Sequence, residues 1–436
     1  MNELETSFLS CIGCGRKADV LTERAFSCPD CGNLYDMIVP VPLHHRPADW
    51  KALFARKSDF NSGVWDFKPW VAPDLSADNI VSIGEGLVPL VEAGRHLKEY
   101  IGMPLKLWLS LRGKNPTGSF KDDGMTVLVS IAKAGGVEFI ACVSTGDTSA
   151  SLAAFCAHAG IKCTVILPAG KITPEQLMQV RLFGAQVILL PGTFDDCMRV
   201  FRELVKRGVY PGNSLNPARI QGHQTTVFQA IRQFGWKSLD VVFVPIGNGS
   251  NASSVGKALR LLTSLGFEHQ TRIIGCQSNA ANPLAISWPN IAIRPDLSAD
   301  EQAALVRQWL EIYQPVKVGE TMATAMRIGD PVSKRKVMRE IIASNGAILD
   351  ASDQEAYPAV LACAKDGHFV CPQSGVALAG LKKAVSRGLV HEGETVVVIC
   401  TADGLKFSQP FLEPKGTQPV LADDCQPDTV ARLMKL

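Results

Sequence analysis

Short runs of apolar, mostly β-branched residues alternate with longer segments of helical periodicity from about residue 104 onward. The runs read LKLWLSL, EFIACVS, CTVILP, AQVILL, VVFVPIG, RIIGCQS and TVVVICT. Strands that are apolar throughout are typical of parallel sheets with helices on both faces, because neither face meets water. The alternation therefore predicts an α/β fold built on parallel sheets. In such folds, the junctions that follow the strands favour phosphate and carboxylate ligands.

The length and charge balance of the chain restrict its class. A chain of 436 residues has room for about two or three domains. Its 44 Lys and Arg residues nearly cancel its 42 Asp and Glu residues, which argues against a nucleic acid partner and favours small molecules. No segment approaches the roughly 18 apolar residues of a membrane span, and the first residues lack a basic stretch followed by an apolar one. We therefore expect no membrane partner and a cytoplasmic location.

Four of the thirteen cysteines form two C-x-x-C turns near the N-terminus. Cys11 and Cys14 make the first pair, Cys28 and Cys31 make the second, and a glycine follows each pair. Two such turns match a tetrahedral Zn²⁺ site with four thiolate ligands and no open position, which indicates a structural role. Iron in a rubredoxin-like site is the alternative metal. A redox pair is disfavoured because such a motif places one pair at the start of a helix.

Lys121 lies in the segment NPTGSFKDDGM, at residues 115–125, between an apolar strand and the helical run TVLVSIAKAGG. At the start of a helix, the macrodipole and desolvation both disfavour a protonated ammonium group and lower its pKa. A neutral amine can attack an aldehyde, as Schiff-base chemistry requires. Taken alone, the residue is better explained as a surface lysine at a helix N-terminus, so the other motifs must decide.

Three further strand ends carry small or hydroxyl residues. The loop PIGNGSN at residues 245–251 allows backbone N–H groups to surround a phosphate at a helix N-terminus, although a tight glycine turn has the same composition. The segment STGDTSA at residues 144–150 suits a carboxylate and a cofactor hydroxyl, with helix capping as the alternative. Thr401 ends the strand TVVVIC, where its hydroxyl can reach a heteroaromatic nitrogen or begin a turn.

In this order, the motifs resemble those of the fold-type II pyridoxal-phosphate enzymes and, among them, the plant-type threonine synthases. The resemblance begins at about residue 82 and includes SFKDDGMTVLVS, STGDTSA, LPAGKIT, NSLNPAR, ANPL, IGDPVS, CPQSGVALAGL and TADGLKF. It implies a fold-type II α/β enzyme with two parallel-sheet domains, which here follow an N-terminal zinc ribbon.

The resemblance implies a role for each motif. Lys121 is the catalytic residue and holds pyridoxal 5'-phosphate as a Schiff base, while Thr401 contacts the pyridine nitrogen and Asp147 lies near the pyridine hydroxyl. The residues expected at the cofactor phosphate are Gly247, Asn248, Gly249, Ser250 and Asn251. The residues expected at the substrate are Ser144, Thr145, Thr148, Ser149, Asn216 and Arg219. A planar guanidinium suits a substrate phosphate, so Arg219 is its candidate ligand, with a surface salt bridge as the equal alternative.

The implied reaction is that of a carbon–oxygen lyase. Phosphate leaves O-phospho-L-homoserine by γ-elimination, and water adds at Cβ to give L-threonine; Lys121 removes the Cα proton and later returns protons. A homodimer is also implied. The chain departs from the family pattern at Asp403, where His is common, at residues 219–224 (RIQGHQ in place of RxEGQK) and at residues 84–90 (GEGLVPL).

These departures leave two alternative functions open. The first keeps the cofactor and changes the substrate, as in a β-replacement on O-phosphoserine or a dehydratase acting on a hydroxy amino acid. The second is a zinc-ribbon binding protein with a degenerate enzyme body, against which the retained lysine and phosphate loop argue.

We expect four segments along the chain. They are a four-cysteine zinc ribbon at residues 1–45, an irregular arm packing on the body at residues 46–95, a catalytic body at residues 96–412 with a smaller subdomain at about residues 125–220, and a C-terminal extension at residues 413–436.

Overall fold

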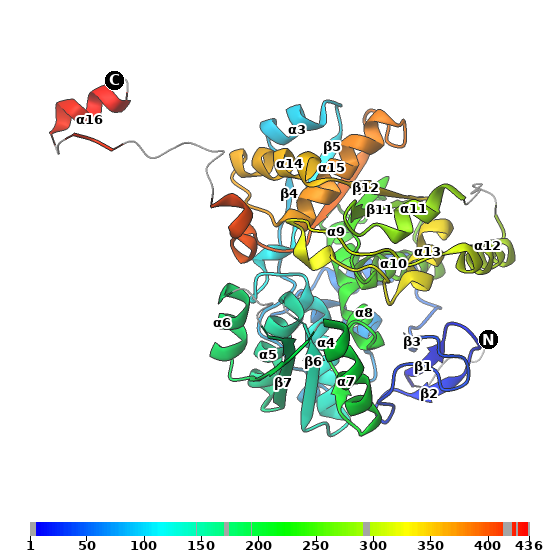
Figure 1. Ribbon diagram of the computed structural model, residues 1–436. Coiled ribbons are helices and arrows are strands. Elements are labelled where there is room, and N and C mark those ends of the chain that lie inside the picture. The colour runs from blue at the N-terminus through cyan, green and yellow to red at the C-terminus, as the bar shows by residue number, and fades with distance from the viewer. Residues whose placement is uncertain are drawn as a thin grey trace. The chain divides into compact units, whose positions relative to one another are not determined.

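The computed structural model describes residues 6–144, 146–169, 174–192, 194–290, 297–412, 421–423 and 426–434 (Figure 1). Its contacts divide the chain into two units, Met1–Lys406 and Phe407–Leu436. The second unit contains the terminal helix α16 (Pro427–Met434). Among the helices of the described residues, none has the length and apolar character needed to cross a membrane.

The larger sheet of the first unit has six strands in the order β12-β11-β10-β13-β5-β4. The strands are β4 (Leu90–Glu92), β5 (Lys106–Leu111), β10 (Val241–Pro245), β11 (Arg272–Ser278), β12 (Ala347–Ala351) and β13 (Thr395–Cys400). All pairs are parallel except that of the edge strand β4 with β5. Every residue of β10 and β13 is buried, as expected where helices cover both faces of a sheet.

A second sheet has four parallel strands in the order β8-β7-β6-β9. Its strands are β6 (Phe139–Val143), β7 (Lys162–Pro168), β8 (Gln186–Leu190) and β9 (Tyr210–Pro211). Two parallel sheets in one chain confirm the predicted fold class.

The N-terminal residues form a three-stranded antiparallel sheet in the order β2-β1-β3. Its strands are β1 (Phe8–Cys11), β2 (Lys17–Asp19) and β3 (Tyr35–Ile38). The following arm packs aromatic side chains on the body: the ring of Trp70 lies 4.9 Å from that of Phe228 and 5.9 Å from that of Phe267. Side chains of the ribbon, arm and body belong to one continuous apolar core.

Helices connect and cover these sheets (Figure 1). In the first unit, the α-helices are α1 (Pro47–Phe54), α2 (Lys68–Val71), α3 (Arg95–Ile101), α4 (Lys121–Ala134), α5 (Asp147–Ala159), α6 (Pro174–Leu182), α7 (Phe194–Lys206), α8 (Pro217–His223), α9 (Thr225–Gln233), α10 (Ser250–Ser264), α11 (Pro283–Ser287), α12 (Ala299–Ile312), α13 (Lys334–Ala343), α14 (Asp353–Lys365) and α15 (Pro372–Ser386). Short 3₁₀ helices span Trp65–Phe67, Ala77–Asn79, Arg112–Lys114, Trp288–Asn290, Thr324–Met326, Gly404–Phe407 and Gln409–Phe411. Helix α15 packs against β10, β11 and β13, while α10 and α13 pack against β11. This packing fixes the N-termini of α10 and α13 at one end of the sheet.

Candidate active site

Lys121 is the first residue of α4, and its side chain is partly buried. Its Nζ lies 3.9 Å from the centre of the Phe120 ring. Desolvation, together with the positive charge of Arg219, lowers the pKa of Lys121 to about 7, while Asp147 and Cys371 oppose that shift. A substantial fraction of this amine is therefore neutral near neutral pH, as a nucleophilic lysine requires.

The loop at residues 247–251 has the features of an anion site. It joins β10 to α10, a helix of 15 residues whose N-terminus attracts negative charge. Gly249 has φ +87°, and a Cβ on it would lie 2.5 Å from Cγ2 of Val337. Both side-chain amide atoms of Asn251 are buried without a hydrogen-bond partner among the described residues. An unpartnered buried amide beside a helix N-terminus indicates room for a ligand with polar oxygens.

Asp147 begins α5 and is buried. Its Oδ1 forms an ion pair with Lys406 Nζ at 3.0 Å, and the same Nζ donates to the Thr117 carbonyl at 2.7 Å. Lys406 thus joins the STGDTSA segment to the turn that precedes Lys121. The TADGLK motif contained this residue, but its distant partner could not be identified from spacing.

The hydroxyls of the STGDTSA segment mostly form hydrogen bonds with backbone groups of the same turn. Ser144 Oγ accepts from the Gly146 N–H at 3.2 Å, and Ser149 Oγ donates to the Gly146 carbonyl at 2.7 Å. Thr148 Oγ1 lies 3.5 Å from Arg219 Nη2 and so faces the guanidinium. Thr145 lies outside the described residues.

Arg219 and Asn216 lie at the start of α8 and are both buried. Arg219 donates to the Gly212 carbonyl at 3.3 Å, and its Nε has no hydrogen-bond partner among the described residues. Burial lowers the pKa of Arg219 to about 10. Asn216 accepts from the Ala218 N–H and donates to the Pro211 carbonyl, both at 3.1 Å, so its amide caps the helix.

Thr401 follows β13 and is held against the turn of Lys121. Its carbonyl accepts from the Phe120 N–H at 2.8 Å, and its own N–H donates to Ser374 Oγ at 3.0 Å. Its Oγ1 lies 3.4 Å from Cys371 Sγ, a buried thiol whose pKa is raised by desolvation. The structure therefore brings Lys121 and Thr401 to the same end of the large sheet.

Asp403 contacts a lysine and the turn that follows it. Its carboxylate lies 3.4 Å from Lys114 Nζ and accepts from the Leu405 N–H at 3.0 Å, so it caps the turn that follows it.

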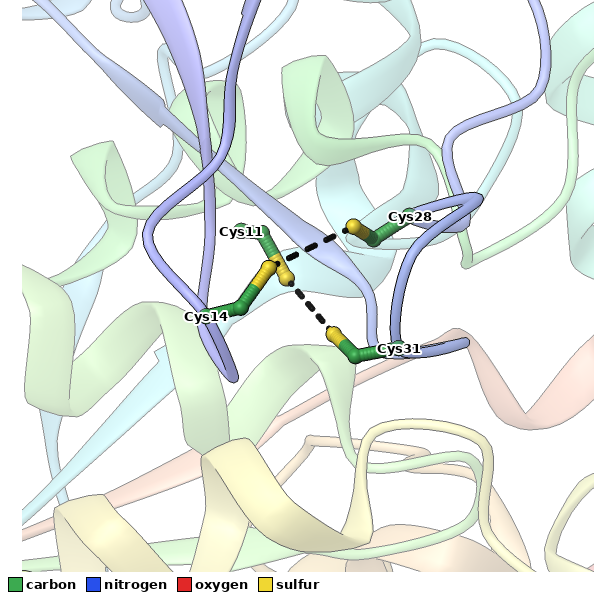
Figure 2. A group of neighbouring side chains, drawn as sticks. All are labelled: Cys11, Cys14, Cys28 and Cys31. Carbon is green, nitrogen blue, oxygen red and sulfur yellow. Dashed lines mark hydrogen bonds between the residues drawn. The ribbon is translucent and has the colours of Figure 1, made fainter.

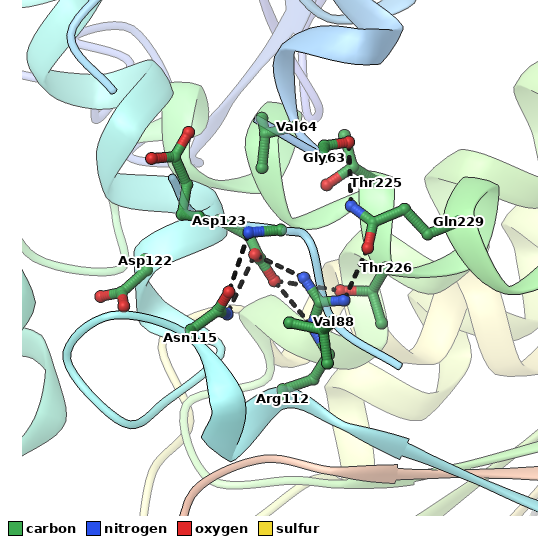
Figure 3. Close-up of polar contacts among 12 residues, drawn as sticks. Gly63, Val64, Val88, Arg112, Asn115, Asp122, Asp123, Thr225, Thr226 and Gln229 are labelled. Carbon is green, nitrogen blue, oxygen red and sulfur yellow. Dashed lines mark hydrogen bonds and ion pairs between the residues drawn. The ribbon is translucent and has the colours of Figure 1, made fainter. Parts of the chain in front are cut away.

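A buried polar network supports the lysine helix, and the sequence interpretation missed it (Figure 3). Arg112 Nε donates to Asp123 Oδ2 at 3.0 Å, Nη2 lies 2.5 Å from Oδ1, and Nη1 donates to Gln229 at 2.8 Å. Asn115 and Thr226 donate to the same carboxylate at 3.1 and 3.3 Å. Asp123, the second acidic residue after the lysine in SFKDDGM, was the available signal, since a carboxylate in an apolar helix needs a buried partner.

His223 is a second residue that the sequence interpretation did not place in the site. It is fully buried on α8, and its ring centre lies 4.9 Å from that of Phe120. Burial and the charges of Arg219 and Lys121 hold the pKa of His223 well below its usual value, so the imidazole is neutral.

The four N-terminal cysteines converge (Figure 2). Their Sγ atoms all lie within 4.8 Å of one another, with Cys11 and Cys31 at 3.3 Å and Cys14 and Cys28 at 3.6 Å. A tetrahedral Zn²⁺ with bonds of about 2.3 Å separates its sulfurs by about 3.8 Å, so this spacing fits a metal.

The fold, Lys121 and the loop at residues 247–251 together indicate a class of protein. The family model described as "Pyridoxal-phosphate dependent enzyme" matches residues 81–402, and the chain belongs to that family. Within it, the chain is similar to threonine synthases: it is 35% identical to that of Methanocaldococcus jannaschii over 98% of both chains, and 37% identical to threonine synthase 2, chloroplastic, of Arabidopsis thaliana over 83% of this chain and 69% of the relative. These identities place it in the threonine synthase group.

Solved structures support the same fold. The threonine synthase of Escherichia coli matches with a TM-score of 0.67 and 17% identity, covering 94% of this chain and 92% of that one. A maize serine racemase matches with a TM-score of 0.59 and 17% identity, covering 82% of this chain and 96% of that one. At such identities, the likeness concerns the fold alone.

Proposed function

We propose that this chain converts O-phospho-L-homoserine and water into L-threonine and inorganic phosphate, as a threonine synthase. The observation that carries the proposal is Lys121, because a pKa of about 7 provides a neutral amine in a chain of this family. The similarity to threonine synthases along 98% of the chain supports this choice of reaction.

The residues of the site fit pyridoxal 5'-phosphate. Lys121 would hold its aldehyde carbon, and residues 247–251 would hold its phosphate, since the α10 N-terminus and the unpartnered Asn251 amide offer the donors that an anion needs. Thr401 and Asp147 are the proposed neighbours of its pyridine nitrogen and hydroxyl. When bound, the cofactor supplies an electron sink for the charge that develops on the substrate.

Lys121 carries the proton transfers in this proposal. Its neutral amine accepts the proton from Cα, and the resulting ammonium returns protons to the carbon skeleton later in the reaction. The Thr401 hydroxyl is a weaker acid–base partner for a ring nitrogen than a carboxylate would be. The chemistry therefore depends more strongly on Lys121.

The substrate carries two anionic groups, so the site needs two clusters of donors. We assign the substrate phosphate to Arg219, whose buried guanidinium retains an unpartnered Nε. The substrate carboxylate is assigned to the N-terminus of α5 and its hydroxyls. The ion pair of Asp147 with Lys406 compensates a negative charge that would otherwise repel that carboxylate. Asn216 contributes by capping α8, which fixes the position of Arg219.

The four cysteines are proposed to bind one structural Zn²⁺, with tetrahedral iron as the alternative. Support comes from the mutual approach of the four Sγ atoms, which leaves no position open for a substrate. The homodimer, which the resemblance implies, and the cytoplasmic location, which the sequence pattern predicts, remain predictions.

Product analysis tests the proposed reaction. Purified protein is incubated with O-phospho-L-homoserine and, separately, with O-phospho-L-serine, and both phosphate and amino acid products are measured. Threonine formed in equal amount to the phosphate released from the first substrate supports the proposal. Reaction with O-phosphoserine alone would assign the chain to another lyase or β-replacement reaction.

One observation favours that second candidate. Gln221, His223 and Gln224 depart from the family pattern, and all three are buried on α8, which carries Arg219, or directly after it. These changes lie beside the proposed phosphate ligand, where a change of residue alters which substrate fits.

A further inference from the structure

Strand β3 of the ribbon lies against α10 and α13 through a buried ionic cluster. Asp36 Oδ1 lies 2.7 Å from Lys336 Nζ, and its Oδ2 lies 2.9 Å from Arg339 Nη2. Lys336 also donates to the Tyr35 carbonyl at 2.6 Å, and Lys257 donates to the Met37 carbonyl at 2.5 Å. We call Asp36, Lys257, Lys336 and Arg339 the ribbon–helix cluster. It joins one ribbon strand to both helices.

A second contact joins the cysteine cluster to the same helix. Asn33 donates to Cys31 Sγ at 3.4 Å and to the Cys31 carbonyl at 3.2 Å. Its side-chain oxygen accepts from Arg335 Nη1 at 3.1 Å, in the first turn of α13. The loop that holds Cys31 is therefore hydrogen-bonded to the start of α13.

The N-termini of these two helices shape the proposed phosphate loop. Ser333, which precedes α13, donates its N–H to the Asn248 carbonyl at 3.0 Å, and the Val332 N–H donates to Asn248 Oδ1 at 3.4 Å. A Cβ on Gly249 would collide with Val337 of α13. The space around residues 247–251 therefore depends on where α13 lies relative to α10.

Charge explains how the ribbon contributes to the spacing of the two helices. Lys257 and Arg260 lie on α10, and Lys336 and Arg339 lie on α13, so cations of both helices repel one another. Glu340 of α13 pairs with Arg260 and Arg339, while Asp36 of the ribbon pairs with Lys336 and Arg339. Burial opposes ionisation of Asp36, yet Lys336, Arg339 and Lys257 hold the pKa of this carboxyl well below its usual value. Burial lowers the pKa of Lys257 to about 7, and Asp36 is the main charge that opposes this shift. An ionised Asp36 thus offsets the part of this repulsion that involves Lys257 and Lys336.

We propose that Asp36 is a positioning residue for the cofactor phosphate. The metal-loaded ribbon holds α10 and α13 at the spacing that residues 247–251 need in order to bind a phosphate, so metal loading and cofactor affinity are coupled. The inference rests on the proposed binding of pyridoxal 5'-phosphate. Because coupling between sites is reciprocal, the bound cofactor also retains the metal more tightly.

The test compares two ligands that differ only in the phosphate. Metal-loaded protein, freed of cofactor, is titrated with pyridoxal 5'-phosphate and with pyridoxal, and binding is followed by absorbance. The Asp36→Asn variant is expected to bind pyridoxal 5'-phosphate about tenfold more weakly, with unchanged affinity for pyridoxal. Metal content is measured in parallel and should remain that of the parent.

Two further variants separate positioning from general loss of stability. Asp66→Asn is the matched control, because Asp66 is a similarly buried carboxylate that pairs with Arg232 at 2.9 Å and lies in the arm, outside the ribbon. The Asp66→Asn variant should have a lower melting temperature than the parent but the same affinities for pyridoxal 5'-phosphate and for pyridoxal. Arg335→Ala removes only the contact with Asn33, and it serves as the test if Asp36→Asn does not fold. Its affinity for pyridoxal 5'-phosphate should fall about threefold, with no change in its affinity for pyridoxal.

Removal of the metal from the parent protein completes the experiment. A chelator should weaken binding of pyridoxal 5'-phosphate and not of pyridoxal, and bound pyridoxal 5'-phosphate should slow metal loss. Equal affinities in parent, variants and metal-free protein overturn the coupling, as does an equal loss for both ligands. A parent that binds neither ligand overturns the proposed cofactor as well, which distinguishes the two failures.

Discussion

Replacement of Arg112 by Met should destabilise the chain by about 3–5 kcal/mol, the usual consequence of removing one partner of a buried ion pair. The exposed side-chain fractions of Arg112 and Asp123 are 1% and 0%, and two guanidinium nitrogens contact the carboxylate (Figure 3). Asn115 and Thr226 remain as donors after the change, but neither carries charge. The carboxylate therefore stays buried without a counter-ion.

The stability lost by the Arg112→Met variant should depend on pH in a defined direction. Burial already raises the pKa of Asp123 above the ordinary value of 3.8, while Arg112 opposes this shift, so removal of the arginine raises that pKa further. A carboxyl group with a raised folded-state pKa destabilises the fold only where it is ionised. The deficit of the variant relative to the parent should therefore increase as pH rises from the folded-state pKa of Asp123 in the parent to its higher pKa in the variant.

Urea unfolding followed by tryptophan fluorescence, at about pH 5 and about pH 8, measures this deficit. Lys98→Met is the control, because Lys98 pairs with Glu92 on the surface and its loss should cost less than about 1 kcal/mol. The double variant Arg112→Met with Asp123→Leu should recover most of the lost stability, since no buried charge then remains. A deficit below about 1 kcal/mol, a deficit independent of pH, or a double variant no better than the single one would refute the reasoning.

Three further outcomes follow from the site. Lys121→Ala should abolish the adduct that borohydride traps in the presence of pyridoxal 5'-phosphate, while the melting curve stays that of the parent. In the parent, the rate of adduct formation should rise as pH increases through about 7. A rate that falls over this range would contradict the assignment. Cys28→Ser should lower the metal content from about one ion per chain, measured by elemental analysis, and full content would exclude this ligand set. Asp403→His should leave phosphate release and threonine formation intact, because Asp403 contacts Lys114 and the Leu405 N–H; a changed product would show that it reaches the substrate.

The strand positions could be predicted from the sequence because buried parallel strands are continuous apolar runs. Each of the seven runs contains a strand, from β5 to β13. The exceptions have physical causes. Strand β12 contains Asp350 and two alanines within five residues, and β9 has only two residues, so neither presents an apolar run.

The candidate site could be predicted where one short segment carries the chemistry. Lys121 and the cysteine pairs are of this kind, since a helix start or a pair of turns determines their surroundings locally. The partners of Asp147 and Arg112 were not predictable in the same way. Lys406 lies far along the chain from Asp147, and Gln229 is 117 positions from Arg112, so only the tertiary fold brings these groups together.

The contact between Tyr35 and Lys336 joins positions 301 residues apart, and this separation has a consequence for folding. During synthesis the ribbon emerges well before α13, so it can take up the proposed metal before α13 exists. Contacts of such long range form late, because the intervening chain must already be ordered. Docking of the ribbon is therefore expected to be one of the last steps of assembly. Cells starved of metal should accumulate a form of the chain in which the two parallel sheets have formed but α10 and α13 have not reached their final spacing.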